Sequence, residues 1–257
     1  MNKPLAIVLF FFAFVTTLTA GPLEPDGPPA PTHKTLTQIE PRTALASNSG
    51  QTQLLIDQSG TYYLTEDIAV VGDHGIVITA DDVELDLNGF TVSGSGSLDF
   101  FYGIYLQDTA NVSIRNGTVT GFNTNGIRCD TGSRMTRLTS ITVRDNDSSG
   151  IACSNARGLI ADDLMVTTNG GTGISCDACL IKSSVISNNS GTGVRLRHGS
   201  MLVGSIVNRN SPAGTDHGVF CFGGGLIVDS AVTANGSDFL HNIDASCTQP
   251  AGHNLAP

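Results

Sequence analysis

Apolar and polar positions follow a repeating pattern along most of the chain. Each repeat begins with Gly, then Ile or Val, then any residue, then an aliphatic residue or Cys. The copies are Gly75–Ile78, Gly103–Leu106, Gly126–Cys129, Gly150–Cys153, Gly173–Cys176, Gly193–Leu196 and Gly218–Cys221. A second apolar stretch follows in the repeats, with apolar residues alternating with small or polar ones, which is typical of a strand with one buried face. The pattern predicts two short strands per repeat and no helix after residue 50.

The spacing of the repeats indicates how the strands are arranged. Successive anchor glycines are 28, 23, 24, 23, 20 and 25 residues apart. Repeats of this length indicate a solenoid, in which each unit buries its apolar face by stacking on its neighbours. The six-residue repeat of left-handed β-helices is absent. We therefore predict an all-β protein, a parallel β-helix of about 7–9 coils.

Asn recurs just beyond the second strand of each repeat. The positions are Asn123, Asn146, Asn169, Asn189, Asn210 and Asn235. Because Asn tolerates a left-handed backbone and bonds its own chain, these residues predict a recurring sharp turn.

The ends of the chain differ from the repeats. Residues 1–20 have the features of a signal peptide, with Lys3 before an apolar run from Leu5 to Val15 and small residues near a cleavage site. A linker is expected over residues 21–48, which hold more than half of the ten prolines. The β-helix domain is predicted over 49–250 and a C-terminal tail over 251–257. No later segment is apolar for long enough to span a membrane, so we expect a secreted or periplasmic protein.

Net charge restricts the partners. The formal charge of −10 disfavours nucleic acid and anionic membranes, both of which attract clustered Lys and Arg. Oligomeric state is left open by the sequence.

The sequence also resembles a known superfamily. Residues 60–65 (GTYYLT), 80–92 (ADDVELDLNGFTV) and the later Gly-Ile units resemble bacterial right-handed parallel β-helix repeat proteins of the pectate-lyase-like superfamily, including NosD-like repeats. The resemblance covers about residues 40–245 and implies a right-handed solenoid. The superfamily includes polysaccharide lyases, hydrolases, epimerases, phage tailspikes and adhesins. Of the pectin hydrolase motifs only Asp162-Asp163 is found, and the pectate lyase motifs are missing.

The third position of each anchor strand should point into the solenoid, and in four repeats it is Cys. These are Cys129, Cys153, Cys176 and Cys221. The favoured interpretation is a column of buried core residues. Disulfides between neighbouring coils, Cys129–Cys153 or Cys153–Cys176, stay open as alternatives, because adjacent strands lie within bridging distance.

Two further cysteine arrangements have different interpretations. A disulfide between Cys221 and Cys247 would fasten the last coil. The CxxC spacing of Cys176 and Cys179 lacks the context of a redox motif.

Alternate residues of the anchor strands should face solvent and form one flank of the solenoid. This flank carries Arg, acids and aromatics, which suit uronate carboxylates and sugar rings. The predicted glycan-binding residues are Tyr105, Arg128, Asp130, Asp177, Arg195, Arg197, Phe220 and Phe222. Asp130 and Asp177 are the only catalytic candidates: two coils would separate them by roughly 10 Å, near the spacing of inverting glycosidases.

Three functions compete on this basis. The first is binding of extracellular or cell-envelope polysaccharide without catalysis. The second is a lyase, hydrolase or epimerase acting on a uronate-type glycan, and the third is a structural or adhesive rod. Compact coils without long loops favour the first.

No metal or other cofactor is predicted. Calcium at Asp145, Asp147 or Asp163 is the one alternative, although these residues form no compact oxygen-ligand motif.

Overall fold

The computed structural model describes residues 41–47, 53–95, 100–213, 216–236 and 243–250. The chain divides into two units, Met1–Glu40 and Pro41–Pro257. The predicted signal peptide, the tail 251–257 and most of the predicted linker lie outside the described residues. Within those residues every regular element is a strand, and no helix is present that could cross a bilayer.

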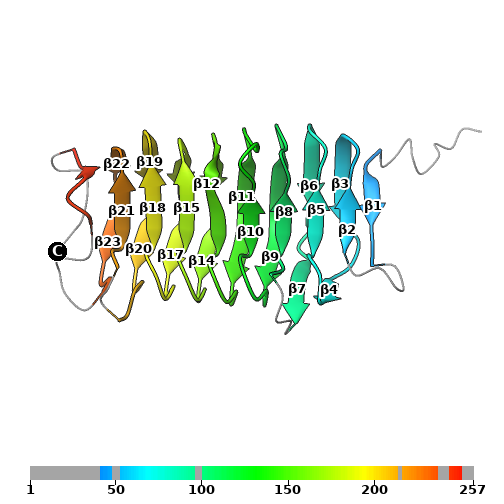
Figure 1. Ribbon diagram of the computed structural model, residues 1–257, viewed down its shortest axis with the longest axis horizontal. Helices are drawn as coiled ribbons and strands as arrows, with labels where there is room; N and C mark the ends of the chain where they lie inside the picture. The colour runs from blue at the N-terminus through cyan, green and yellow to red at the C-terminus, as the bar shows by residue number, and fades with distance from the viewer. Residues whose placement is uncertain (1–40, 48–52, 96–99, 214–215, 237–242, 251–257) are drawn as a thin grey trace, which may run out of the picture. The chain divides into compact units, whose positions relative to one another are not determined.

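The strands form two parallel sheets (Figure 1). The eight-stranded sheet, here sheet B, consists of β2 (Leu54–Ile56), β5 (Ile76–Ile78), β8 (Ile104–Leu106), β10 (Ile127–Cys129), β12 (Ile151–Arg157), β15 (Ile174–Asp177), β18 (Val194–Arg197) and β21 (Val219–Phe222). The sixteen-stranded sheet, sheet A, has two arms. One arm holds β1 (Thr43–Leu45), β3 (Gly60–Leu64), β6 (Val83–Asp86), β9 (Ser113–Thr120), β11 (Arg137–Arg144), β13 (Ile160–Asp162), β16 (Leu180–Lys182), β19 (Ser200–Val203), β22 (Gly225–Val228) and β24 (Cys247–Thr248). The other holds β4 (Ile68–Val71), β7 (Thr91–Ser95), β14 (Met165–Thr167), β17 (Val185–Ser187), β20 (Ile206–Asn208) and β23 (Ala231–Thr233), and pairs with β9 and β11.

Each strand pairs with the equivalent strand one coil later. Ile127 lies opposite Ile151, and Ile151 lies opposite Ile174. The eight strands of sheet B therefore mark eight turns of a parallel β-solenoid. The predicted all-β parallel solenoid of about 7–9 coils is confirmed. Strand pairing begins with β1, within the segment expected as linker, because Thr43–Leu45 pairs with β3.

The core is built from the alternate residues that the period-two pattern assigns to the interior. Ile127, Ile151 and Ile174 are completely buried, and each stacks on the equivalent residue of the next coil. Complete burial of an aliphatic side chain of this size stabilises a fold by about 1.5–3 kcal/mol. Repetition of these columns along the solenoid therefore supplies most of its hydrophobic stabilisation.

The prediction of two strands per repeat is wrong for most of the described coils, which have three; the exceptions are the coils that hold β9 and β11. The second apolar stretch of one repeat, from Leu159 to Val166, is divided into β13 and β14 at Asp163, and that of the next repeat, from Leu180, is divided into β16 and β17 at Ser183. Asp163 and Ser183 have φ values of 54° and 51°, in the left-handed region. One residue in this conformation bends the chain, so each coil has three faces instead of two.

The recurring Asn residues mark the predicted sharp turn and bond their own chain across it, as Asn146 Nδ2 does to the Arg144 carbonyl at 3.0 Å, but they also have a second role. From Asn146 to Asn235 their side chains are buried and form an amide ladder, in which each Nδ2 donates to the Oδ1 of the next coil at 2.9–3.0 Å. The left-handed residue is the one before each ladder Asn: Asp145, Thr168, Asn188, Arg209 and Ala234. The Asn side chain is therefore selected for internal hydrogen bonding, and the neighbouring residue makes the bend.

Asn123 is not part of this ladder. The backbone N–H of Phe122 donates to Asn146 Oδ1 at 3.1 Å, so Phe122 occupies the equivalent position in that coil. The buried phenyl ring ends the ladder at the N-terminal side. Asn123 lies one residue later and accepts a hydrogen bond from the Phe101 N–H at 3.1 Å.

The cysteines of the interior column are buried, but they are not free core residues. The disulfides are Cys129–Cys153, Cys176–Cys179 and Cys221–Cys247, with Cα separations of 4.7, 6.0 and 5.2 Å. The interpretation as an unbonded column is therefore wrong, as is the alternative Cys153–Cys176. Disulfides of this kind persist in oxidising compartments, which is consistent with an extracellular or periplasmic protein.

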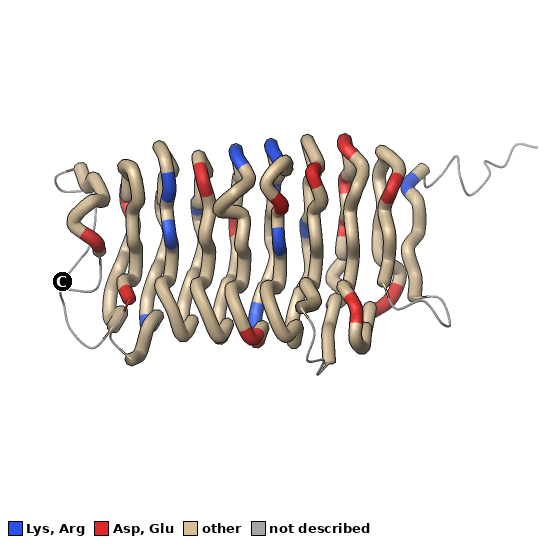
Figure 2. Tube along the Cα trace, viewed as in Figure 1, with Lys and Arg blue, Asp and Glu red and all other residues tan. Residues whose placement is uncertain are grey.

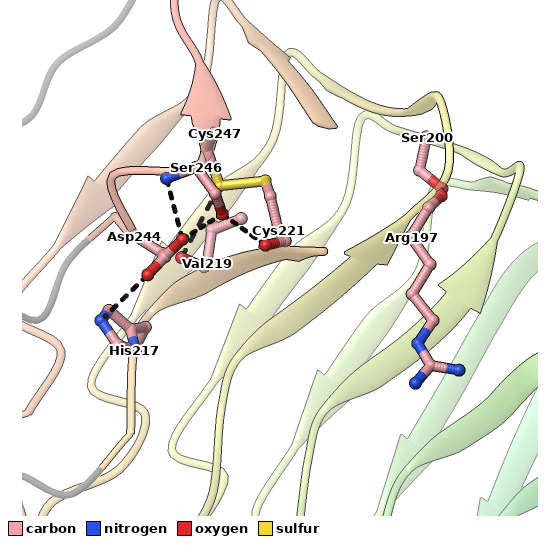
Figure 3. Close-up of a disulfide and its surroundings, with 8 residues drawn as sticks. All are labelled: Arg197, Ser200, His217, Val219, Cys221, Asp244, Ser246 and Cys247. Carbon is pink, nitrogen blue, oxygen red and sulfur yellow. Dashed lines mark hydrogen bonds and ion pairs between the residues drawn. A yellow bond between two sulfur atoms is a disulfide. The ribbon is translucent and has the colours of Figure 1, made fainter. Parts of the chain in front are cut away.

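The C-terminal coil is fastened around the disulfide between Cys221 and Cys247 (Figure 3). Ser246 bonds both the Cys221 carbonyl and the Asp244 carboxylate. His217 Nε2 lies 3.7 Å from Asp244 Oδ2. Burial raises the pKa of Asp244, but the bonds from Ser246 and the nearby His217 outweigh it, so the pKa lies below the usual value.

An ionic network fastens the other end of the solenoid. Asp86 accepts hydrogen bonds from Arg42 beside β1, from Arg115 and Asn116 on β9, and from the Asn88 N–H of its own coil. Burial raises the pKa of Asp86, but the Asn88 and Arg115 bonds outweigh it and hold the pKa below 3.8. The carboxylate thus joins the N-terminal strands while it is ionised.

Candidate functional site

The outer face of sheet B carries most of the residues that the sequence nominates. In parallel strands, residues in register project to the same side. One continuous row, here the central row, consists of Val77, Tyr105, Arg128, Ala152, Ser175, Arg195 and Phe220. Figure 1 shows these strands side by side along the solenoid.

The central row has a low middle and two raised ends. Ala152 and Ser175 are small and buried, whereas Arg128 and Arg195 stand beside them. Three strand steps separate the two arginines, so their backbones are roughly 14 Å apart. The row therefore forms a shallow saddle with a guanidinium group on each side.

An aromatic cluster lies at the N-terminal end of this row. The His74 ring stacks on Tyr102 at 5.1 Å between centroids, and Tyr105 lies 5.2 Å from His74 and 4.9 Å from Tyr102. The Tyr105 hydroxyl donates to Asp130 Oδ2 at 3.2 Å. Burial, more than the nearby Asp130 carboxylate, raises the Tyr105 pKa above 10.0. The cluster offers ring faces and a hydroxyl to a ligand.

His74 and Tyr102 were missed at the sequence level. His74 Nδ1 accepts the Tyr102 N–H at 2.9 Å, so the neutral ring carries its proton on Nε2. Burial lowers the His74 pKa, and the adjacent Asp73 opposes this effect. Both residues directly precede an anchor glycine, Gly75 or Gly103. The sequence signal that could have identified them is an aromatic residue directly before the anchor glycine of two successive repeats.

The C-terminal end of the row pairs arginines with aromatic rings. The Arg195 guanidinium lies over Phe220 at 6.0 Å, and that of Arg197 lies over Phe222 at 5.6 Å. The Nε atoms of both arginines are buried and have no hydrogen-bond partner among the described residues. Each guanidinium group therefore packs over a phenyl ring of the next coil and makes no ion pair with a described residue.

A second row, here the corner row, lies along one edge of sheet B. It contains Arg134, Arg157, Asp177, Arg197 and Phe222, which are in register. A register shift between Cys153 and Arg157 in β12 brings Arg157 opposite Asp177. Arg134 and Arg157 thus lie on neighbouring coils, and Arg197 lies two coils beyond Arg157.

Asp177 is bound by a histidine. Its Oδ1 lies 3.0 Å from His198 Nδ1, and its side chain is 15% exposed, compared with 59% for His198. A hollow of about 310 Å³ is lined by Arg157, Asp177, Ala178 and His198. The imidazole is thus oriented by a carboxylate beside a guanidinium group, an arrangement that can transfer a proton.

The catalytic candidates Asp130 and Asp177 are separate features. Asp130 is bonded to Tyr105, and Asp177 to His198. The shift in β12 interrupts the column in which the two were expected to align. The structure therefore does not assemble them as one carboxylate pair.

The central and corner rows together carry five arginines that have no acidic partner among the described residues. Arg128, Arg134, Arg157, Arg195 and Arg197 make no ion pair with any described residue, although the chain has a net charge of −10. In Figure 2 the basic positions lie mainly over the central coils. The site therefore favours an anionic ligand.

The acids considered for calcium have other contacts. Asp145 accepts from Thr168 at 2.6 Å and from Arg144, and Asp163 accepts from Ser140 at 2.8 Å. No three His, Cys, Asp or Glu side chains of the described part of the chain converge as metal ligands.

Comparisons with known proteins identify the family. A family model described as a right handed beta helix region matches residues 74–242. The chain belongs to this right-handed β-helix family.

Three solved structures illustrate what the chain is similar to. The pectate lyase Pel9A matches with a TM-score of 0.51 and 12% identity over 83% of this chain and 68% of the lyase. The periplasmic alginate epimerase AlgG matches with a TM-score of 0.46 and 13% identity, over 79% of this chain and 77% of the epimerase. Tailspike protein 2 of bacteriophage CBA120 matches with a TM-score of 0.46 and 14% identity, over 85% of this chain and 43% of the tailspike domain. No curated protein matched the sequence.

Proposed function

We propose that this protein binds an anionic polysaccharide across the outer face of sheet B. The observation that carries the proposal is the set of arginines in the central and corner rows that make no ion pair within the described part of the chain. A guanidinium group binds a carboxylate through two parallel hydrogen bonds, and an unpaired cluster in an acidic protein concentrates such ligands.

The two ends of the site are suited to different parts of a sugar chain. Tyr102 and Tyr105 present aromatic faces, which pack against the apolar side of a sugar ring. Arg195 and Arg197 are supported by Phe220 and Phe222 and present cations to acidic groups. A linear glycan along the solenoid would contact both ends and cross the saddle between them.

The fold and the disulfides support this assignment. Pel9A, which shares the fold, is a pectate lyase. Three disulfides favour an oxidising compartment, where extracellular and cell-envelope polysaccharides occur. We therefore expect the protein to meet its ligand outside the cytoplasm.

The test is a binding titration with polygalacturonate, alginate and neutral dextran. Polygalacturonate or alginate should bind and dextran should not, and higher salt should weaken binding. Replacement of Arg195 and Arg197 together by Ala should lower the affinity at least tenfold, because a charge-assisted hydrogen bond contributes about 1.5–3 kcal/mol.

A matched control is Arg137→Ala, which removes an exposed arginine from sheet A. This variant should bind the anionic glycan as the unchanged protein does. Equal binding of dextran, or equal losses in the control and in the double variant, would contradict the proposal.

The Asp177–His198 pair supports a second candidate, catalysis on the same class of glycan. An oriented imidazole beside Arg157 could remove a proton from a sugar whose acidic group the arginine holds. Incubation with the same polymers, followed by absorbance for unsaturated ends and a reducing-sugar assay, tests it. Turnover that His198→Gln abolishes, with binding retained, would favour the enzyme.

A further inference from the structure

The outward-facing side chains of one row of sheet A are unexpectedly apolar. Ile160, Leu180, Met201 and Leu226 lie in direct register on β13, β16, β19 and β22, and each is partly exposed. Their inward neighbours, Ala161, Ile181, Leu202 and Ile227, fill the core at 0% exposure. The outer row, here the apolar row, therefore lies on the opposite side of the sheet from the core.

The outward rows on β14, β17, β20 and β23 differ in polarity, because Met165, Val185, Ile206 and Ala231 form one apolar row in register. Thr167, Ser187, Asn208 and Thr233 lie in register on β14, β17, β20 and β23, and all are polar. Polar residues are the usual choice for the wet face of a strand. The apolar row of β13, β16, β19 and β22 departs from this rule on four successive coils.

A hollow lies at the N-terminal end of the apolar row. It has a volume of about 280 Å³, and its lining includes Ser113, Thr136, Arg137, Gly158 and Ile160. Arg137 lies in register between Ser113 and Ile160, and is exposed. It makes no ion pair with a described residue. Thr136 is 2% exposed, and its hydroxyl has no hydrogen-bond partner among the described residues.

The corner that borders the apolar row leaves it accessible. Gly158 and Ala178 occupy that corner beside Ile160 and Leu180, and neither has a long side chain. From Arg137 to Leu226 there are four strand steps, or roughly 19 Å. The surface thus presents one cation followed by a linear apolar track.

We propose that the hollow and the apolar row bind a single-chain amphiphile with a carboxylate head. The head pairs with the guanidinium group of Arg137, and the alkyl chain lies along Ile160, Leu180 and Met201. Burial of apolar surface on both partners drives the association, and the arginine fork sets its direction. The site is on sheet A, so it is independent of the glycan proposal for sheet B.

Charge disfavours a second copy of the chain as the occupant. Two copies that pair antiparallel would bury each Arg137 against the apolar end of the other row, at Leu226. Two copies that pair parallel would bring the two Arg137 side chains together. Both arrangements leave a cation without an acidic partner in an interface, which is costly.

Calorimetric titration of the intact, oxidised chain with decanoate, decan-1-ol and acetate tests the proposal. Decanoate, kept below its micelle concentration, should bind one molecule per chain, and acetate should not bind. Arg137→Gln should weaken decanoate about tenfold and leave decan-1-ol unchanged, because the lost interaction is charge-assisted. Met201→Gln should weaken both alkyl ligands, and Met201→Leu should restore them.

Arg195→Ala is the control on the other sheet and should not affect decanoate binding. Far-UV circular dichroism establishes that each variant is folded, and Arg137→Met, which also removes the charge, replaces Arg137→Gln if the latter does not fold. The proposal is overturned if decanoate does not bind, or binds Arg137→Gln and Met201→Gln as tightly as the unchanged protein. It is also overturned if sedimentation shows a dimer that Met201→Gln dissociates.

Discussion

The amide ladder leads to a sharp prediction about stability, because two adjacent Asn residues differ in their environment. Asn189 is completely buried, whereas Asn188 is exposed. Asn189 Nδ2 donates to Val166 O at 3.1 Å and to Asn210 Oδ1 at 2.9 Å. Its Oδ1 accepts the N–H and the Nδ2 of Asn169, at 3.1 and 2.9 Å.

Asn189→Ala removes all four of these bonds. It leaves the Asn169 N–H without its acceptor in the interior and opens a void where the amide was. A buried polar group without a partner costs about 1–3 kcal/mol. Because more than one group loses a partner and a void is added, we expect a loss of about 3–5 kcal/mol in the free energy of unfolding.

Asn188→Gly is the matched control. Asn188 has a φ of 55°, which Gly adopts without strain, and its side chain makes only a 3.4 Å contact with Ser187. We expect a change within about 0.5 kcal/mol. Urea denaturation, followed by far-UV circular dichroism with the disulfides intact, measures both. A loss below about 1 kcal/mol for Asn189→Ala, or similar losses for both variants, would refute the view that internal amides stabilise the stack.

The remaining predictions concern other parts of the solenoid. The pKa of Asp86 is lower in the folded state, so the carboxylate stabilises the fold fully above pH 3.8 and this stabilisation is lost as the pH falls further. The variant Asp86→Asn should therefore be less stable at neutral pH, and its free energy of unfolding should depend less on pH in the acid range. Cys247→Ser should increase hydrogen exchange in the last coil, near Cys221, and leave the central coils protected, because each coil contacts only its neighbours. A Cβ on Gly150 would lie 2.5 Å from Val166 Cγ1 and 2.8 Å from the Gly173 carbonyl oxygen. Gly150→Ala should therefore overpack the core, reduce the free energy of unfolding by about 1–3 kcal/mol and lower the melting temperature in a thermal scan.

The architecture was predictable because successive coils repeat the same pattern of inward and outward residues. Ile127, Ile151 and Ile174 all follow a glycine at the same place, so one inward residue predicts the others. The division of each second stretch at Asp163 and Ser183 was not predictable from alternation. A single left-handed residue there interrupts the strand without changing the apolar pattern.

The candidate site was predictable only in part. Arg195 and Phe220 follow from residue parity, since one residue of each anchor strand must face outward. The pairing of Asp177 with His198 depends on a corner where the chain turns at a φ of 36°. The register shift before Arg157 was likewise not predictable, because the three extra residues that β12 holds between Cys153 and Arg157 change which residues align without changing the apolar pattern.

The amide ladder also affects how a solenoid of this kind can become longer during evolution. In the coil between Gly173 and Gly193, the Asn189 amide accepts from the coil before it and donates to the coil after it, in the same manner as its neighbours. Duplication of that segment in the gene would insert a turn that fits on either side without redesign. Length is therefore a freely adjustable property of this scaffold, and the reach of any surface carried on it can change in steps of one turn.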